Sequence, residues 1–362
     1  PTGDFDGDGV ANGMDAGPSD PCIPNPNALA CPTGDFDGDG VPNGIDTSPS
    51  NPCLPNPNAL ACPTGDFDGD GVVNGSDPGP SDPCIPNPCA LLLAPKVLLA
   101  GSFNDVTNTM SDGLRALGLI PNAQPYNGSA YTEFAYSGPE TIGAGVLSVT
   151  GNNAIVDWVL VELRDPANPL LVIARKAALL QRDGDVVSSS DGVSPLQFNG
   201  VSVGSYYVVL RHRNHLGVMT ANAISLPGTL VTVDFTSPST PNYQLPGANG
   251  SPYAQEVQDN GRRALWMGNM SNQGSTGDRV IYQGGNADPD EPYFRVFLDP
   301  ANTVPLPNYV VTAYDRADGN MDGHVILQGG NADSDLPFYT VFLFPGNPSQ
   351  LPNFVVREQV PY

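Results

Sequence analysis

The first 90 residues of this chain contain no lysine, arginine, histidine or glutamate. They contain fourteen aspartates, so this quarter of the 362-residue chain carries 14 of its 24 net negative charges. Without cations such a segment repels itself, and it is too poor in apolar residues to build a core. The acidity and the lack of a basic patch exclude nucleic acid as a partner and argue against anionic membranes.

The usual catalytic motifs are also missing. The sequence has no G-x-S-x-G, H-E-x-x-H, phosphate-binding loop or G-x-G-x-x-G, so we predict that the protein is not an enzyme. Its longest apolar run, ALLLAPKVLLAG, is short and interrupted, so we predict no membrane span.

What the first 90 residues do contain is one motif written three times, as GDFDGDGVANGMD, GDFDGDGVPNGID and GDFDGDGVVNGSD. The copies begin at Gly3, Gly34 and Gly65, a period of 31 residues. Counted from the first aspartate, oxygen ligands fall at positions 1, 3, 5, 7, 9 and 12, with glycine at position 6. This is the ligand order of an EF-hand-type calcium loop, in which position 7 offers a backbone carbonyl.

A solvated acidic loop is the alternative, but three matching copies favour calcium as the cofactor, and its binding would then supply folding free energy. The predicted ligands are Asp4, Asp6, Asp8, Val10, Asn12, Asp15, Asp35, Asp37, Asp39, Val41, Asn43, Asp46, Asp66, Asp68, Asp70, Val72, Asn74 and Asp77.

An EF-hand has helices on both sides of its loop, and here Pro18, Pro21, Pro24 and Pro26 exclude an exit helix. Helix-free loops of this type with nearby cysteines resemble thrombospondin type 3 repeats, and the resemblance covers residues 1–90. It implies largely irregular structure wrapped around calcium. Members of that family hold more than one ion per repeat, which implies two further ligands, Asp20 and Asp82.

All six cysteines precede residue 90. An even number in a segment without a core indicates disulfides, and therefore an oxidising, extracellular location. Zinc is the alternative, but a C-x8-C spacing without histidine is a poor zinc pattern. The count allows several connectivities, of which we favour local pairs: Cys22–Cys31, Cys53–Cys62 and Cys84–Cys89.

Residues 96–236 alternate between β-rich segments and turn residues, which predicts an antiparallel β-sandwich. One short helix is predicted in TMSDGLRALGLI, with Met110, Leu114 and Leu117 on one face. His212 and His215 are three residues apart, so a continuous strand would place them on opposite faces. We expect them to form hydrogen bonds at a strand end rather than to bind one metal.

After a predicted linker, 237–277, two copies of a small β unit fill residues 278–362. They align without a gap at a period of 45 residues, from RVIYQGGNADPDEPYFRVF to HVILQGGNADSDLPFYTVF. We interpret the phenylalanine-rich part of each as a strand. Before the second copy, DGNMDGH is half a calcium loop; ordinary turn chemistry is the alternative for its candidate ligands Asp318, Asn320 and Asp322.

The fold class is therefore predicted as mainly β: an irregular calcium-binding stalk, a sandwich and two tandem β units. Strings such as VDWVLVELRD and NMDGHVILQGG make residues 96–362 resemble an uncharacterised module near the ends of large secreted Bacteroidota surface proteins. That resemblance implies export and display at the cell surface, and it brings no catalytic residues.

These observations predict an extracellular structural protein, stabilised by calcium, whose partners are copies of itself in a bacterial surface filament or fibre. The alternative is an adhesin or carbohydrate-binding module with the repeats as a spacer. In that alternative a glycan is the partner, and exposed aromatic side chains such as Tyr126, Tyr131 and Tyr136 stack on its sugar rings, although for each of the three we favour packing in the core or in a turn.

Overall fold

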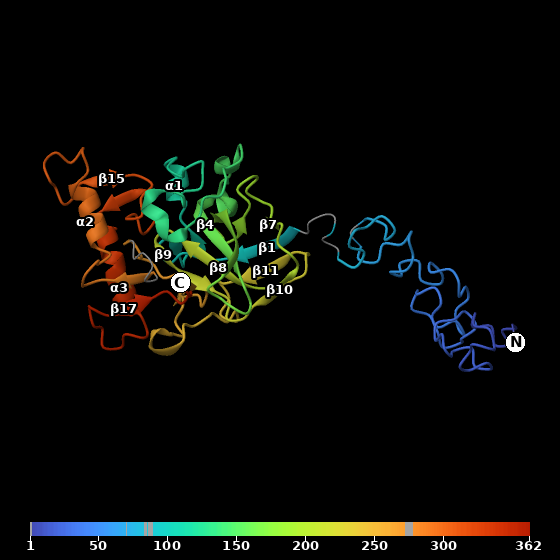
Figure 1. Ribbon diagram of the computed structural model, residues 1–362. Helices are drawn as coiled ribbons and strands as arrows, with labels where there is room; N and C mark the ends of the chain where they lie inside the picture. Colours follow the sequence, from blue (N-terminus) through green and yellow to red (C-terminus); the bar gives the residue numbers. More distant parts are fainter. Residues whose placement is uncertain (1, 70, 83–84, 86–89, 272–277) are drawn as a thin grey trace. The chain divides into compact units, whose positions relative to one another are not determined.

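The computed structural model describes residues 2–69, 71–82, 85, 90–271 and 278–362. The chain divides into two compact units, Pro1–Cys89 and Ala90–Tyr362 (Figure 1). The first unit corresponds to the predicted stalk, and the second contains the predicted sandwich, linker and tail. No helix among the described residues has the length and apolar character that a membrane span requires.

The described part of the first unit consists of turns and bends, without a helix or a strand (Figure 1). Its only fully buried apolar side chains are small, and they come from the segments that close each repeat: Ala28, Cys31, Ala59 and Cys62. A core of two alanines and two cysteines is far too small to hold this segment together by burial alone. The fold of this unit must therefore depend on hydrogen bonds, cross-links and ligands.

The second unit is built on a six-stranded antiparallel sheet. Its path is β10-β8-β4-β5-β6, with β9 paired to β8. The strands are β4 (Ile155–Arg164), β5 (Val172–Gln181), β6 (Val186–Val187), β8 (Gly204–His212), β9 (His215–Met219) and β10 (Ile224–Leu226). All ten residues of β4 are buried, because this strand lies between β5 and β8 and is covered on both faces.

A smaller sheet packs against the first, and the two share one hydrophobic core. Its order is β11 (Val231–Asp234), β1 (Ala90–Lys96), β7 (Leu196–Asn199). The β1–β11 pair is parallel, which departs from the fully antiparallel sandwich that we predicted. The fold class itself is mainly β, as the alternating sequence pattern indicates.

The predicted short helix exists as α1 (Gly113–Ala116), and Leu114 is buried beneath it. Met110 instead lies in β3 (Thr109–Met110), paired with β2 (Phe103–Asn104), and Leu117 is 46% exposed. The segment GVLSVTG is not a strand; it forms the 3-10 turn η2 (Val146–Ser148). Further 3-10 turns are η1 (Ser129–Phe134), η3 (Gly151–Asn153), η4 (Gly247–Asn249) and η6 (Asp333–Asp335).

Residues 237–277, predicted as a linker, belong to the same compact unit in their described part. They contain the paired strands β12 (Glu256–Val257) and β13 (Arg263–Ala264). Leu265 is fully buried and bridges to Leu99, and Trp266 is buried in a second hydrophobic cluster. The apolar string ALWM could have indicated that this segment is buried, because a linker exposed to solvent does not need four consecutive apolar residues.

The tail contains two copies of a strand–helix–strand unit, β14-α2-β15 and β16-α3-β17. The bounds are β14 (Arg279–Ile281), α2 (Asp290–Phe297), β15 (Val310–Thr312), β16 (His324–Ile326), α3 (Leu336–Leu343) and β17 (Val355–Arg357). The phenylalanine-rich segments are thus helices, not the strands that we predicted. Pro337 lies in the first turn of α3, where its fixed φ favours helix initiation.

The two copies interlock. Strand β14 pairs with β17, and β15 pairs with β16, so each two-stranded sheet takes one strand from each copy. Helix α3 contacts the first sheet and α2 the second, although each helix follows a strand of the other sheet. Each pair buries equivalent valines: Val280 with Val356, and Val311 with Val325. A single copy would leave both of its strands unpaired.

Candidate metal centres

In the first repeat, backbone N–H groups donate to the side-chain oxygens of the predicted ligands, to both oxygens of Asp4 and to one oxygen of each of the others. Asp4 accepts hydrogen bonds from Gly7 N at 2.8 Å and Gly9 N at 3.0 Å. Asp8 Oδ1 accepts from Val10 N at 2.8 Å. The chain therefore curls around its own carboxylates, as a calcium loop does. Asp35 and Asp66 accept the equivalent pairs of hydrogen bonds in the second and third repeats.

The second oxygen of several carboxylates is buried and has no hydrogen-bond partner among the described residues. This Oδ2 belongs to positions 3, 5 and 12 in both of the first two repeats: Asp6, Asp8, Asp15, Asp37, Asp39 and Asp46. Unpaired buried carboxylate oxygens are costly unless something neutralises them. Their recurrence at the same three positions indicates a shared binding centre for a cation.

The distances agree with this interpretation. Asp4, Asp6 and Asp8 each offer one oxygen within 4.8 Å of the others, as do Asp35, Asp37 and Asp39. Desolvation raises the pKa of Asp6, and the negative charges of Asp15 and Asp8 act in the same direction. The residues therefore fit a hard divalent cation such as calcium, which takes six to eight oxygen ligands.

Position 6 of each loop needs glycine. Gly9, Gly40 and Gly71 have φ values of +92°, +90° and +91°, in the left-handed region that residues with a Cβ atom rarely adopt.

In the third repeat, Asp77 has a buried Oδ2 without a partner among the described residues. Asp68 and Val72 occupy their predicted loop positions, whereas Asp70 lies outside the described residues.

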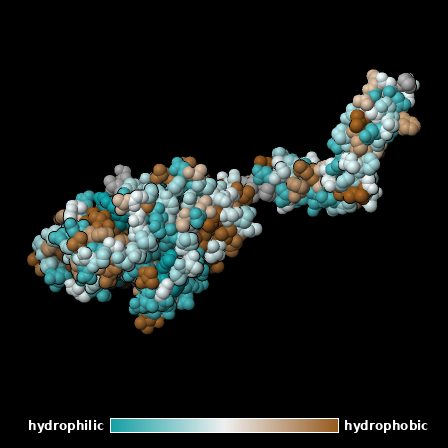
Figure 2. All heavy atoms as spheres, turned by 90° about the horizontal axis from the view of Figure 1, so that it is seen from below, coloured by the Kyte–Doolittle hydropathy of each residue, from teal (hydrophilic) through white to brown (hydrophobic). Residues whose placement is uncertain are grey.

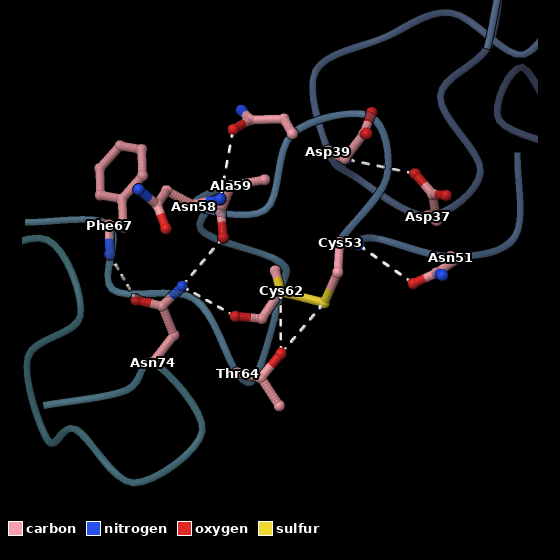
Figure 3. The surroundings of a disulfide bond; sticks show 11 residues. Asp37, Asp39, Asn51, Cys53, Asn58, Ala59, Cys62, Thr64, Phe67 and Asn74 are labelled. Atoms are coloured by element: carbon pink, nitrogen blue, oxygen red, sulfur yellow. Dashed lines mark hydrogen bonds between the residues drawn. A yellow bond between two sulfur atoms is a disulfide. The ribbon is translucent and has the colours of Figure 1, made fainter. Parts of the chain in front are cut away.

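The asparagines at position 9 connect neighbouring repeats. Asn74 Nδ2 donates to the carbonyls of Ala59 and Cys62, both at 2.9 Å, and its Oδ1 accepts from Phe67 N at 2.9 Å (Figure 3). Asn43 makes the same hydrogen bonds with the end of the first repeat. The position 9 side chain thus has a clamping role that sequence analysis missed. The role of Asn12, Asn43 and Asn74 as calcium ligands stays a prediction.

We expect Asn74→Ala to loosen the junction between the second and third repeats. The change removes the acceptor of Phe67 N and one of the two donors to the carbonyls of Ala59 and Cys62, which keep Cys62 N and Gly65 N, and this costs about 1–3 kcal/mol. Amide hydrogen exchange over residues 59–75, measured in saturating calcium, should accelerate. The exposed Asn58 offers a matched control, and Asn58→Ala should leave these rates unchanged. Equal rates in both variants would contradict the clamping role.

Two of the favoured disulfides are present, Cys22–Cys31 and Cys53–Cys62. Each closes the segment that the next loop clamps, and Thr64 Oγ1 donates to the sulfurs of the second one (Figure 3). The pair Cys84–Cys89 lies outside the described residues. Disulfides here replace the hydrophobic core that this composition cannot form.

A comparison with known protein families agrees with the geometry of these loops. A family model for the thrombospondin type 3 repeat matches residues 30–56. This match covers the end of the first repeat, with Cys31, and most of the second, with its loop from Asp35 to Asp46. It supports a calcium-binding, extracellular protein, and the disulfides fit secretion. No curated protein and no solved structure matches the chain, so the resemblance of residues 96–362 to Bacteroidota proteins has no support from a homologue.

The two additional ligands that the thrombospondin type 3 resemblance implies lie at the surface. Asp20 and Asp82 are exposed, and Asp20 Oδ1 accepts a hydrogen bond from Cys22 N at 3.1 Å. Nothing in their surroundings marks them as part of the loop centres, and their role as ligands stays a prediction.

The weaker candidate ligands in the tail, Asp318, Asn320 and Asp322, lie in a turn of the second unit. A further carboxylate near them, Asp333, was not among the predicted ligands. Asp318 and Asp333 are both fully buried, whereas Asp322 is half-buried. Burial raises the pKa of Asp318 to about 7, with Asp322 acting in the same direction. Burial and the charge of Asp318 raise the pKa of Asp333 to about 8. The charges of these three carboxylates therefore act on one another, although their oxygens do not all lie within 4.8 Å of one another as those of Asp4, Asp6 and Asp8 do.

The histidines are not on opposite faces. His212 ends β8 and His215 begins β9, and the two-residue turn between them pairs the two positions. Their rings lie 5.0 Å apart and are fully buried. The expectation of hydrogen bonding at a strand end is confirmed, since their Nδ1 atoms are 3.2 Å apart and Gly101 N donates to His215 Nε2 at 3.1 Å.

The histidines belong to a buried polar network around Asp157, which sequence analysis missed. Asp157 is fully buried and accepts from Arg213 Nε at 2.8 Å and Tyr314 O–H at 2.8 Å, and it lies 3.1 Å from His212 Nε2. Burial lowers the pKa values of His212 and His215, so both rings are neutral, which agrees with their hydrogen bonds. The network joins β4, the β8–β9 turn and the tail.

Proposed function

We propose that this protein is an extracellular structural subunit, with a calcium-stabilised stalk, that assembles with copies of itself into a filament or fibre. One observation carries the structural part: the second and the third loop each clamp the disulfide-closed segment of the repeat before it. Loops that bind an ion and also hold their neighbour form an array that can be extended repeat by repeat. Filling the centres with calcium would stiffen this array.

The second unit supports self-assembly through an apolar face that is present twice. Phe294 on α2 and Tyr339 on α3 occupy equivalent positions and are 52% and 45% exposed. Leu298 and Leu343 are equivalent too, and are 74% and 64% exposed. Figure 2 shows hydrophobic residues at the end of the second unit where Figure 1 places α2 and α3. Exposed aromatic and leucine side chains in such numbers indicate an interface.

We propose a second copy of the chain as the occupant of this face, because duplication gives one chain two equivalent apolar faces. A subunit with two such faces can join a neighbour on each, and an interface that does not close on itself produces filaments.

The aromatic side chains named as examples for the adhesin alternative lend it little support. Tyr126 and Tyr131 are buried, and Tyr126 O–H donates to Trp158 O at 2.9 Å within the core. Tyr136 is half-buried and donates to Glu140 at 2.7 Å. Tyr126 and Tyr131 therefore offer no exposed ring for a sugar, and the hydroxyl of Tyr136 is already bonded. We also propose that the chain is not an enzyme, on the sequence argument alone.

Electron microscopy of the full chain tests the assembly. We expect filaments or oligomers in calcium, and their loss in Phe294→Asn and Tyr339→Asn variants. Leu170→Asn is the matched control: Leu170 is 58% exposed but lies in the loop between β4 and β5. Both tryptophans are in the second unit, so their fluorescence verifies that each variant is folded. Particles that stay monomeric at all concentrations would overturn the proposal.

A further inference from the structure

The turn from Asp318 to Gly323 in the second unit repeats the hydrogen bonds of the calcium loops in the first. Gly323 N donates to Asp318 Oδ2 at 3.0 Å, as Gly9 N donates to Asp4 Oδ2 at 3.0 Å. Gly323 also has a φ of +89°, close to the value at Gly9. Position 1 and position 6 of a calcium loop are thus both reproduced.

Positions 3 and 5 follow the same rule. Asn320 Oδ1 accepts from Asp322 N at 2.9 Å, and Asp322 Oδ1 accepts from His324 N at 2.9 Å. In the first repeat, Asp8 and Val10 donate in the same way to the side chains two residues before them. Each side chain is therefore held at the edge of the turn by one oxygen.

A second observation points to a ligand. Asp318 is fully buried, and its Oδ1 has no hydrogen-bond partner in the described part of the chain. The bond from Gly323 fixes the other oxygen of the same carboxylate, so Oδ1 cannot turn away to solvent. A buried carboxylate oxygen of this kind needs a cation or a proton. Unpaired buried carboxylate oxygens also mark the calcium loops of the first unit, although there they belong to positions 3, 5 and 12, and both oxygens of Asp4 at position 1 accept hydrogen bonds.

Basic side chains nearby do not satisfy this charge. The charge of Arg213 acts on Asp318, but its Nε donates to Asp157, its Nη1 donates to the carbonyl of Asp315, and its Nη2 has no partner among the described residues and forms no ion pair with Asp318. Its guanidinium also stacks on the Tyr314 ring at 4.5 Å. Arg316 is paired with Glu133. In the described residues no basic group lies within ion-pair distance of Asp318, Asp322 or Asp333.

The other copy of the tail unit provides an internal comparison. Asp288, the equivalent of Asp333, accepts four hydrogen bonds, from Met270 N, Ser271 N, Ser271 Oγ and Ile281 N. Its charge is therefore met by protein donors. Ser271 precedes the gapless alignment of the two copies, which begins at Arg279, and in the second copy Gly319 N is the donor that takes the place of Met270 N and Ser271 N.

In the second copy Asp333 accepts from Gly319 N and Ile326 N, both at 2.8 Å. Among the described residues no side-chain hydroxyl donates to Asp333, and the charges of two further carboxylates, Asp318 and Asp322, act on it. With fewer donors and more acids than at Asp288, this turn has a negative charge that a cation can neutralise. Asn320 and Asp322 also line an open surface pocket of about 430 Å³, which gives an ion a path from solvent.

We propose that the turn Asp318–Gly323 is a calcium-binding site of the second unit, separate from the repeats of the first. Asp318 Oδ1, Asn320 Oδ1 and Asp322 Oδ2 are its side-chain ligands, water from the pocket completes the shell, and Asp333 adds negative charge. All the ligands are hard oxygens, as calcium requires. This site does not rest on the proposed function, because it lies in the other unit and needs no assembly.

Native mass spectrometry of the full chain in calcium chloride tests the site by counting ions. We expect Asp322→Asn to bind one calcium ion fewer than the wild type. Asp335→Asn, which removes an exposed charge from the same segment, should keep the full number. Calcium should also raise the unfolding midpoint of the second unit, followed by tryptophan fluorescence, in the wild type and not in Asp322→Asn.

Asp318→Asn removes the central ligand but alters a buried position, so it can fail to fold. Asp322→Asn and Asn320→Ala change groups at the pocket surface and keep the proposal testable. An unchanged ion count in both of these variants would overturn the proposal. So would a count that falls equally in Asp335→Asn. Magnesium chloride in place of calcium should give no comparable rise in midpoint, since magnesium favours its own water shell.

Discussion

Removal of calcium from the full chain should unfold the first unit and leave the second folded. The first unit has almost no hydrophobic core, and its carboxylates repel one another when no cation lies between them. Calcium at about 100 times its dissociation constant stabilises a folded site by about 2.7 kcal/mol. Without calcium, the loop that carries Asn43 is not held in one conformation, so the Asn43 side chain cannot keep its hydrogen bond to the first repeat.

Amide hydrogen exchange with and without chelator measures this directly. We expect fast exchange throughout residues 2–82 in chelator, and little change in the second unit apart from the turn that ends at Gly323. Asp37→Ala should produce the same loss in calcium, confined to the second repeat and its junctions. Exchange in the first unit that is the same with and without calcium would contradict the account.

The second large effect is expected from Asp157→Ala, which should destabilise the second unit by about 3–5 kcal/mol, the usual cost of breaking a buried ion pair. The change leaves Arg213 charged and buried without its carboxylate. It also removes the acceptor of Tyr314 O–H and the partner of His212. Because these groups join the sheet to the tail, we expect both to lose stability together.

Chemical denaturation followed by tryptophan fluorescence measures the loss. Asp191→Ala, which changes a largely exposed carboxylate in the loop before β7, is the control and should cost far less. In the wild type, burial opposes ionisation of Asp157, but Arg213 and His212 outweigh it, so its pKa is lowered. This contribution is therefore present above about pH 4 and is lost as the pH falls further. Equal stabilities of the two variants would show that the network is not essential.

The first unit was largely predictable because its chemistry is local. Ligands such as Asp4 and Asp8 lie within one turn of chain, and Cys22 and Cys31 are nine residues apart. Spacing alone therefore brings them together. What spacing did not reveal was the contact between repeats, because the clamp of Asn74 depends on how one loop meets the next.

The second unit was less predictable because its contacts are long-range. Short helices such as α3 have too few turns to show a period, and Phe338 and Phe342 suit a strand equally well. The pairing of β14 with β17 joins residues more than 70 positions apart and has no local signal. Asp157 was missed for the same reason, since its partners Arg213 and Tyr314 come from other elements.

The central claim, that the first unit folds around calcium, is tested most directly by titration calorimetry of the full chain. The comparison is between the wild type and a variant that carries Asp6→Ala, Asp37→Ala and Asp68→Ala. The account predicts heat of calcium binding in the wild type, and a loss of at least three bound ions in the variant. The same stoichiometry and heat in both proteins would contradict it.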